Sequence, residues 1–363
     1  MPTAVRVPRR RAWRGAVAAL CAALFTLSPA APATGAEPPP PAPGPPLTVP
    51  ADRLDAALDC PDDLGRSERD PVLLVHGTGV DAGLNWSWNY APALRDLGYD
   101  VCTVDLPGRS LTDIQESAEY VVHALTTVRA ATGRPVDAIG HSQGGLQLRW
   151  ALTYWPGLQG FVDDAVSLGT PEYGAVAGDL VCASSCAPAL HQMSRGSAFL
   201  TALNSGDPTP GPVSYTGIHT RNDTVVVPHR SSVREGARNI ELQDVCGIRL
   251  VTHIGLVYDS VTFRLVRDAL DRPGPADPAR LPPGACLGDP YLPGVGAADL
   301  AYAAAVVAPA AAAAIATAPK TGTSPRRAPT RPGRRADRDR TRTGPGPDPE
   351  DLAPTIDIGV SVN

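Results

Sequence analysis

Short apolar runs alternate with longer amphipathic segments from about residue 47 to residue 319. P-V-L-L-V predicts a buried strand, and the apolar spacing of residues 116–132 predicts a helix that ends at Gly133. Further strands are predicted in Y-D-V-C-T-V-D, V-D-A-I-G, D-A-V-S-L-G, V-S-Y-T-G-I-H and I-R-L-V-T-H, and a further helix over 144–154. This alternation favours an α/β fold, a mostly parallel sheet with helices on both faces.

The two ends of the chain differ in composition from this region. Residues 1–36 combine an arginine-rich start, an apolar core too short to span a bilayer and small residues before a cleavage point at Ala36. That is the pattern of a signal peptide, so we expect a secreted protein, with the Sec or twin-arginine route left open. Residues 37–46 predict a stiff Pro-rich linker, 47–320 one domain, and 321–363 a disordered Pro/Arg-rich tail.

Charge and cysteine content indicate which partners and which covalent cross-links to expect. The formal net charge is −5, with an acidic central region and a basic tail. We therefore expect no nucleic-acid partner, a tail that contacts anionic surfaces, and a monomer. Six cysteines lie beyond the signal segment, an even number that predicts disulfides in an exported chain. A zinc site is the alternative, but only Cys182 and Cys186 are closely spaced and no His/Cys cluster accompanies them.

An apolar, alanine-rich stretch covers residues 300–318, just before the basic tail. Its length and flanking arginines allow a C-terminal membrane anchor. Alanine contributes little to membrane insertion, however, and Pro309 interrupts the segment. We therefore expect alanine-rich helices that pack on the domain.

The segment G-H-S-Q-G, from Gly140 to Gly144, has the G-x-S-x-G spacing of a nucleophile elbow. Such a serine sits on a strained turn between a strand and a helix, where side chains at the two glycine positions would collide with neighbouring backbone. The helix that follows points its free N–H groups at the oxygen on which negative charge develops. The predicted strand before Ser142 and helix after it fit this context.

A serine hydroxyl needs a base to take its proton, and the base needs an acid to orient it. In this kind of fold the chain order is serine, acid, histidine, with the histidine after the last strand. His253 fits that place best among the seven histidines, and we expect structural roles for the other six. Asp223 follows V-S-Y-T-G-I-H and is the preferred acid; Asp207 and Asp244 are the alternatives.

The oxyanion that forms in ester hydrolysis needs two N–H donors. One donor is expected from Gln143, directly after the serine. The loop H-G-T-G, which follows the strand P-V-L-L-V, can supply the other from Thr78 because its glycines let the backbone approach a ligand.

From Leu54 to Lys320 the chain resembles the Candida antarctica lipase B family of α/β-hydrolases and its secreted bacterial relatives. The resemblance rests on L-L-V-H-G-T-G, S-Q-G-G-L-Q-L-R-W, N-D-T-V-V-V-P, D-V-C-G-I-R-L-V-T-H and A-P-A-A-A-A-A-I-A-T-A-P-K. It implies an α/β-hydrolase fold with Ser142 as nucleophile, Asp223 as acid, His253 as base, and Thr78 and Gln143 as the oxyanion hole. It also implies disulfides Cys60–Cys102 and Cys246–Cys286, which leaves Cys182–Cys186 as a local bridge.

Some positions depart from the family pattern. His141 stands where the fungal enzyme has tryptophan, and Glu172 stands where the family has aspartate, either as a buried acid near the site or as a structural group. Residues 175–205 look like the family's mobile cover over the pocket, which a Cys182–Cys186 bridge would stiffen. Val306, Val307 and Ile315 are expected to line the pocket.

The sequence therefore predicts a secreted lipase or esterase that cleaves apolar carboxylic esters, such as acylglycerols, through an acyl-enzyme on Ser142. We expect it to work on a small or lipid ester, at a lipid–water interface where the ester is a lipid, without a metal or organic cofactor. An acyltransferase or polyester depolymerase with the same triad is the alternative within enzymes. A non-catalytic binding protein, tethered to the cell surface by its basic tail, is the alternative outside them.

Overall fold

The computed structural model describes residues 44–182 and 184–322. The predicted signal peptide lies outside the described residues, as do most of the linker and all but the first residues of the tail.

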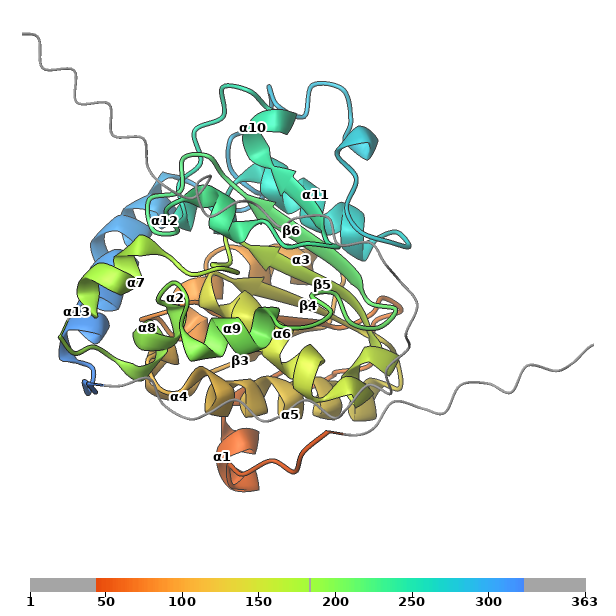
Figure 1. Ribbon diagram of the computed structural model, residues 1–363. Coiled ribbons are helices and arrows are strands. Elements are labelled where there is room, and N and C mark those ends of the chain that lie inside the picture. The colour runs from red at the N-terminus through yellow and green to blue at the C-terminus, as the bar shows by residue number, and fades with distance from the viewer. Residues whose placement is uncertain (1–43, 183, 323–363) are drawn as a thin grey trace, which may run out of the picture. The chain divides into compact units, whose positions relative to one another are not determined.

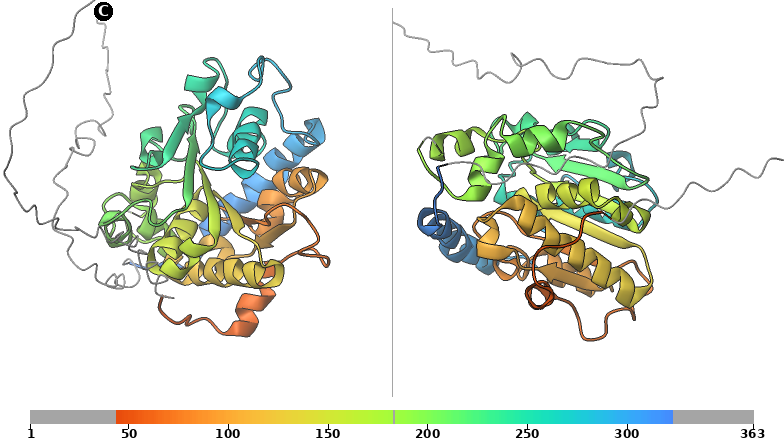
Figure 2. Two further views of the ribbon diagram at one scale, coloured as in Figure 1. Left: turned by 90° about the vertical axis from the view of Figure 1, so that its right-hand side faces the viewer. Right: turned by 60° about the horizontal axis from the view of Figure 1, so that its bottom comes forward.

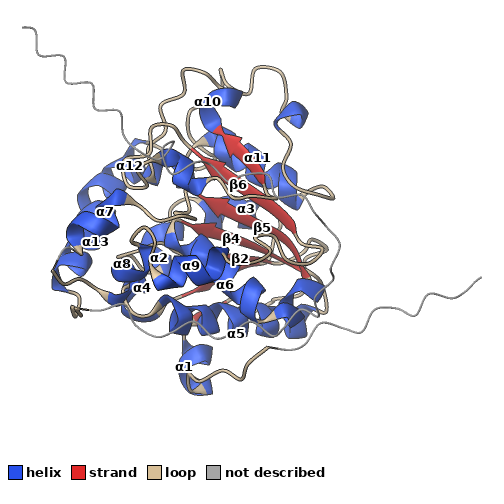
Figure 3. Ribbon diagram, in the orientation of Figure 1, coloured by secondary structure: helices blue, strands red, loops and turns tan. Residues whose placement is uncertain are grey.

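One sheet holds the described strands in the order β1-β3-β2-β4-β5-β6-β7. Figures 1 and 3 show this sheet with β4, β5 and β6 side by side. β1 pairs antiparallel with β3, and the remaining neighbours pair in parallel. The strands are β1 (Leu58–Asp59), β2 (Val72–Val75), β3 (Val101–Val104), β4 (Val136–His141), β5 (Val162–Leu168), β6 (Ser214–His219) and β7 (Arg238–Glu241). The predicted mostly parallel sheet is confirmed.

Helices cover both faces of the sheet because its central strands are apolar on both sides. In β2, Leu73 and Val75 belong to one buried cluster, with residues of α5 and α6. Val72 and Leu74 belong to a second cluster, with residues of α3 and α11 on the other face. Each inward-facing side chain therefore packs against a helix instead of water.

The helices differ greatly in length. α5 and α6 match the helices predicted over 116–132 and 144–154, and α5 ends at Gly133 in a left-handed conformation. The α-helices are α1 (Ala51–Ala56), α2 (Ala82–Trp86), α3 (Tyr90–Asp96), α4 (Pro107–Ser110), α5 (Ile114–Thr132), α6 (Gln143–Tyr154), α7 (Val176–Val181), α8 (Pro188–Met193), α9 (Ala198–Asn204), α10 (Leu242–Val245), α11 (Ser260–Leu270), α12 (Ala297–Tyr302) and α13 (Ala308–Thr317). The 3₁₀ turns are η1 (Pro156–Gly160), η2 (His229–Ser232), η3 (Ile254–Val257) and η4 (Pro278–Arg280), and η5 (Ala303–Val307) is a π-helical turn.

The alanine-rich segment forms one continuous helical stretch of α12, η5 and α13, drawn in blue in Figure 2. Among the described residues, Ala297–Thr317 is the one helical stretch long and apolar enough to cross a membrane. Length and composition alone are weak support for a membrane span. The same stretch contributes Val307, Ala308, Ala311 and Ile315 to the wall of a pocket in the domain.

The predicted strand I-R-L-V-T-H is wrong. The last strand is instead β7, and Ile248 and Leu250 are 97% and 85% exposed in a loop between Cys246 and His253. A four-residue edge strand with one buried side chain, Ile240, carries too weak an apolar pattern to stand out in the sequence. The more apolar run after it was therefore mistaken for the strand.

Three disulfides join the described cysteines: the two pairs that the family resemblance implies and the remaining local pair. They are Cys60–Cys102, Cys182–Cys186 and Cys246–Cys286. The first ties the segment before β2 to β3, and the third ties the loop before His253 to the loop that leads to α12. They are consistent with an oxidising compartment.

Candidate active site

Ser142 occupies the turn between β4 and α6, with φ 55° and ψ −123°. A left-handed φ is uncommon for a non-glycine residue and marks local strain. The backbone N–H of Ser142 donates to the carbonyl of Leu168 on β5 (2.8 Å), which holds the turn against the neighbouring strand. The side chain stays at the carboxyl edge of the sheet, facing a pocket.

The two glycines of the elbow are explained by close backbone contacts. A Cβ on Gly140 would lie 2.5 Å from the backbone nitrogen of Gly145, and a Cβ on Gly144 would lie 2.3 Å from the carbonyl oxygen of Val75. Both distances are far below van der Waals contact. Any larger residue at either position would push the helix away from the sheet and displace Ser142.

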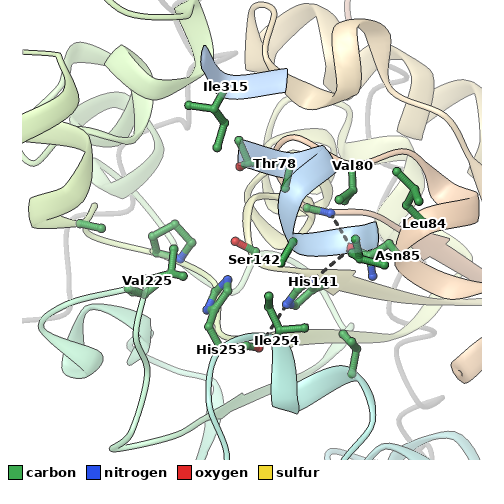
Figure 4. Close-up of a pocket in the computed structure, with 18 of the residues that line it drawn as sticks. Thr78, Val80, Leu84, Asn85, His141, Ser142, Val225, His253, Ile254 and Ile315 are labelled. Atoms are coloured by element: carbon green, nitrogen blue, oxygen red, sulfur yellow. Dashed lines mark hydrogen bonds between the residues drawn. The ribbon is translucent and has the colours of Figure 1, made fainter. Parts of the chain in front are cut away.

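His253 and Asp223 meet beside Ser142. Asp223 lies in the loop after β6, and its Oδ2 accepts a hydrogen bond from Nδ1 of His253 (2.8 Å). Its Oδ1 accepts from the backbone N–H groups of Val225 (2.8 Å) and Val226 (2.7 Å). Burial alone would raise the pKa of Asp223, but His253 and these two N–H groups outweigh it and hold the pKa below its usual value. Asp223 is therefore an ionised acceptor, and the Nε2 atom of His253 is left to act toward Ser142 (Figure 4).

Thr78 lines the pocket, and its side chain is hydrogen-bonded to that of Gln143. The hydroxyl of Thr78 donates to Oε1 of Gln143 (2.5 Å), and Nε2 of Gln143 donates to the carbonyl of Ser110 (2.9 Å). No described residue accepts a hydrogen bond from the backbone N–H of Thr78 or of Gln143. Both N–H groups therefore remain available to a ligand oxygen, as an oxyanion hole requires.

His141 and Asn85 connect the two loops that carry these groups. Asn85 Oδ1 accepts from the backbone N–H of Gly77 (3.1 Å) and lies 3.1 Å from Nδ1 of His141. Nε2 of His141 lies 3.4 Å from the carbonyl of His253. Burial, together with the nearby His253, lowers the pKa of His141 to about 3, so its ring is neutral. His141 is thus a neutral bridge between the Thr78 loop and the His253 loop.

Sequence reasoning did not single out Asn85 or Ser110. Asn85 reaches the site from α2, and Ser110 from a turn in which Arg109 and Ser110 both have positive φ. The carbonyl of Arg109 also accepts from the N–H of Gly79 (2.8 Å), so this turn supports the Thr78 loop. Neither residue lies in a motif, and only the folded chain brings them to the site.

The pocket at Ser142 is a mainly apolar cavity of about 260 Å³. Its lining includes Ser142, His253, His141 and Thr78 (Figure 4). Three segments supply most of the remaining wall: the region from Ala175 to Met193, the loop after Asp223, and α13 with the turn before it. Of the expected lining residues, Val307 and Ile315 line the cavity, whereas Val306 does not and is 42% exposed. Neighbouring residues of a helix point in different directions, which explains the difference.

The other histidines have partners away from Ser142. His76 is buried and accepts from the N–H of Leu106 at Nε2 (2.9 Å), and its pKa is lowered chiefly by burial. His123 pairs with Asp55 (2.8 Å). His219 and His229 face Glu241 (3.6 and 3.3 Å), and His191 contacts the carbonyl of Thr321 (2.7 Å). Asp244, one alternative acid, is paired with Arg221 (3.2 Å) and not with His253.

A parallel sheet between two helical layers, with a serine on a tight strand-to-helix turn, defines an α/β-hydrolase. Residues 70–181 match the family model described as the alpha/beta hydrolase fold. Lipase B of Pseudozyma antarctica is 32% identical over 235 residues, which cover 62% of this chain and 69% of that protein. The crystal structure of Aspergillus fumigatus lipase B matches with a TM-score of 0.74 and 30% identity, over 83% of this chain and 76% of that chain.

A third relative is more distant. A triacylglycerol lipase of Pseudarthrobacter phenanthrenivorans is 34% identical over 119 residues, which cover 31% of this chain and 36% of that protein. Taken with the lipase B matches, these similarities identify the family. The chain belongs to the lipase B family of α/β-hydrolases, and it is a carboxylic ester hydrolase of the lipase and esterase type.

Proposed function

We propose that the protein is a secreted serine hydrolase that cleaves apolar carboxylic esters through an acyl-enzyme on Ser142. The observation that carries this proposal is the 2.8 Å hydrogen bond between Asp223 and His253 at the floor of an apolar pocket that also contains Ser142. The strained turn at Ser142 and the free N–H groups of Thr78 and Gln143 supply the other parts that ester hydrolysis needs.

The first half of the reaction forms the acyl-enzyme. Oγ of Ser142 bonds to the ester carbonyl carbon while its proton moves to Nε2 of His253, and Asp223 stabilises the imidazolium. The carbonyl electron pair moves onto oxygen, where the N–H groups of Thr78 and Gln143 bind it. The bond to the alkoxy oxygen then breaks, and the departing alcohol takes the proton from His253.

The second half repeats these steps with water. His253 takes a proton from a water molecule while the water oxygen attacks the acyl carbon. His253 then returns this proton to Oγ of Ser142 as the carboxylic acid leaves. Removing one oxyanion donor in enzymes of this kind costs about 2.7–4 kcal/mol of transition-state stabilisation. The chemistry draws on no metal or organic cofactor.

The lining of the pocket supports an apolar ester as substrate. Val225, Val226, Val307 and Ile315 surround Ser142, and no Asp, Glu, Lys or Arg is among the described lining residues. Val225 is also 43% exposed, and Val306 beside Val307 is 42% exposed. We propose acylglycerols as the natural class, taken from a lipid–water interface that these exposed side chains contact, in keeping with the lipase names of the relatives.

We further propose that residues 1–36 direct export and that residues 47–320 are the catalytic domain of a monomer. The three disulfides support an extracellular location because such bonds persist in oxidising compartments. The proposed role of residues 321–363 is contact with anionic surfaces.

Hydrolysis of p-nitrophenyl esters from acetate to palmitate, by the wild type and by Ser142→Ala, tests the proposed function. We expect Ser142→Ala to lose about 10⁴–10⁶-fold in kcat, as removal of a serine nucleophile does elsewhere. Ser205→Ala, an exposed serine outside the pocket, is the matched control and keeps full activity. A folded Ser142→Ala that still turns over at the wild-type rate overturns the proposal.

A further inference from the structure

Three aspartates meet at the amino end of β4 and β5, away from Ser142. Asp137, Asp163 and Asp164 each offer a carboxylate oxygen, and these three oxygen atoms lie within 4.8 Å of one another. Asp137 and Ser142 are five positions apart along β4 and the turn after it, about 16 Å at the usual rise of a strand. The proposed ester hydrolysis uses none of the three aspartates.

An irregularity in the sheet explains why three carboxylates share this place. Val136 pairs with Val162, but Ala138 pairs with Ala165, so Asp137 alone faces both Asp163 and Asp164. Such an extra residue is a β-bulge, which is rare between parallel strands and re-aims the side chains next to it. A regular strand would direct Asp163 and Asp164 to opposite faces of the sheet.

Two of the carboxyl groups are buried with few partners. Asp137 and Asp164 are each 2% exposed. Asp137 accepts one hydrogen bond, from the backbone N–H of Asp164 (3.2 Å). Within residues 44–182 and 184–322, neither carboxylate oxygen of Asp164 accepts a hydrogen bond, and its Oδ1 is closed off from water. A buried carboxylate without donors is costly unless a cation or a proton compensates its charge.

The surrounding charges do not provide that compensation. Asp70 adds a further negative charge near Asp137. Among the described residues no basic side chain forms an ion pair with the three aspartates, and Arg134 pairs instead with Asp70 (3.2 Å) and donates to the carbonyl of Glu68. Burial, then the nearby Asp70 and Asp163, raises the pKa of Asp137 to about 8. Burial, then repulsion by Asp137 and Asp163, raises the pKa of Asp164 to about 9.

We propose that Asp137, Asp163 and Asp164 bind a hard divalent cation, Ca²⁺, as a structural ion. Ca²⁺ takes oxygen ligands at about 2.3–2.6 Å, so that opposite ligands lie up to about 5 Å apart, in keeping with the spacing of these three oxygens. Asp163 is exposed and opens the cluster to solvent, so that water can complete the coordination. The ion ties β4, which leads to Ser142, to β5.

Calorimetric titration of the full-length, disulfide-bonded protein with CaCl₂ after chelator treatment tests this proposal. We expect saturable binding of one Ca²⁺ and a rise in the melting temperature.

Two substitutions locate the ion. Asp163→Asn removes an exposed ligand without changing a buried group, and we expect it to weaken Ca²⁺ binding about 10–100-fold. Asp164→Asn abolishes binding and, in chelator, raises the melting temperature because a buried carboxyl group is gone. Asp62→Asn, an exposed aspartate outside the cluster, leaves both properties unchanged.

Either of two results overturns the proposal. If CaCl₂ gives neither heat nor a melting shift, the aspartates form a protonated pair that binds no cation. If Ca²⁺ binds equally well to Asp163→Asn and Asp164→Asn, the ion sits elsewhere on the chain. The activity of wild type toward p-nitrophenyl esters is measured alongside, because a catalytically inactive protein that binds Ca²⁺ would contradict the proposed function alone.

Discussion

Glu172 belongs to a buried charge cluster and not to the surface of the pocket. Its Oε2 accepts from Nη1 of Arg149 (2.8 Å), and its Oε1 lies 3.8 Å from Nε of Arg234. The side chains of all three residues are at most 4% exposed. One carboxylate therefore faces two guanidinium groups, and Arg234 gains further stabilisation over the ring of Tyr215, 4.8 Å from its centre.

Replacing Glu172 by glutamine leaves two buried cations without a counter-charge. We expect Glu172→Gln to lower the free energy of unfolding by about 3–5 kcal/mol, the cost of breaking a buried ion pair. Urea denaturation measures the loss, with Glu235→Gln as an exposed control. A loss below about 1 kcal/mol would mean that water or an anion already neutralises the arginines.

Elements with a strong apolar pattern could be predicted from the sequence. β2 and β4 are buried at every position, and α5 has a clear apolar face and a glycine at its end. β7 could not be predicted, because an edge strand with one buried residue owes its place to pairing with β6, which is remote in sequence. Pairing within the folded sheet therefore made this segment a strand, although its local apolar pattern did not predict one.

The candidate site could be predicted where a local motif fixes geometry. The elbow around Ser142 is such a motif, and the order of serine, aspartate and histidine along the chain pointed to Asp223 and His253. Asn85 and Ser110 carry no local signal, because their hydrogen bonds reach across 56 residues to His141 and 33 residues to Gln143. Contacts of that kind depend on the assembled sheet.

One part of the pocket wall, the region from Ala175 to Met193, is held by a small strap. Cys182 is bonded to Cys186, and Cys186 exchanges two backbone hydrogen bonds with Thr321 (3.3 and 2.9 Å), just beyond α13. The strap therefore joins the segment after α7 to the end of the alanine-rich helical stretch. Both segments line the pocket, so the strap restrains two parts of the wall around Ser142.

We expect the double variant Cys182→Ser/Cys186→Ser to open this segment more often. A disulfide across so short a loop is worth about 2 kcal/mol, or about a 30-fold change in the local opening equilibrium. Limited proteolysis should cleave residues 176–186 faster by up to that factor, since cleavage follows the open population. Ser184→Ala, which keeps the disulfide, is the control. Equal cleavage rates in both variants would show that the contacts with Thr321 alone keep residues 176–186 closed.

At the scale of the domain, the sheet separates two groups of ionisable residues. Asp223, His253 and His141 lie at the carboxyl edge, where the parallel strands deliver their loops to one place. Asp137 and Asp164 lie at the opposite, amino edge of the sheet, on β4 and β5. Burial raises the pKa values of Asp137 and Asp164 and lowers that of His141, so the two edges contribute oppositely to the dependence of stability on pH.

Without divalent cations, we expect the free energy of unfolding to fall as pH rises from about 7 to about 9. Asp137 and Asp164 have folded pKa values near 8 and 9, against about 3.9 when unfolded, so the folded state holds more protons in this range. As the pH rises, each aspartate that holds its proton in the folded state lowers the free energy of unfolding by about 1.4 kcal/mol per pH unit. The effect of each aspartate ends when the pH exceeds its folded pKa. Below about pH 6.5 the buried His141 and His76, whose pKa values are lowered, oppose this trend, because the unfolded histidines take up protons as the pH falls while the two aspartates still favour the folded state. Urea denaturation in chelator across this range measures the slope, and Asp164→Asn should flatten it. A stability that stays level between pH 7 and 9 in the wild type would mean that the two aspartates are already ionised at neutral pH.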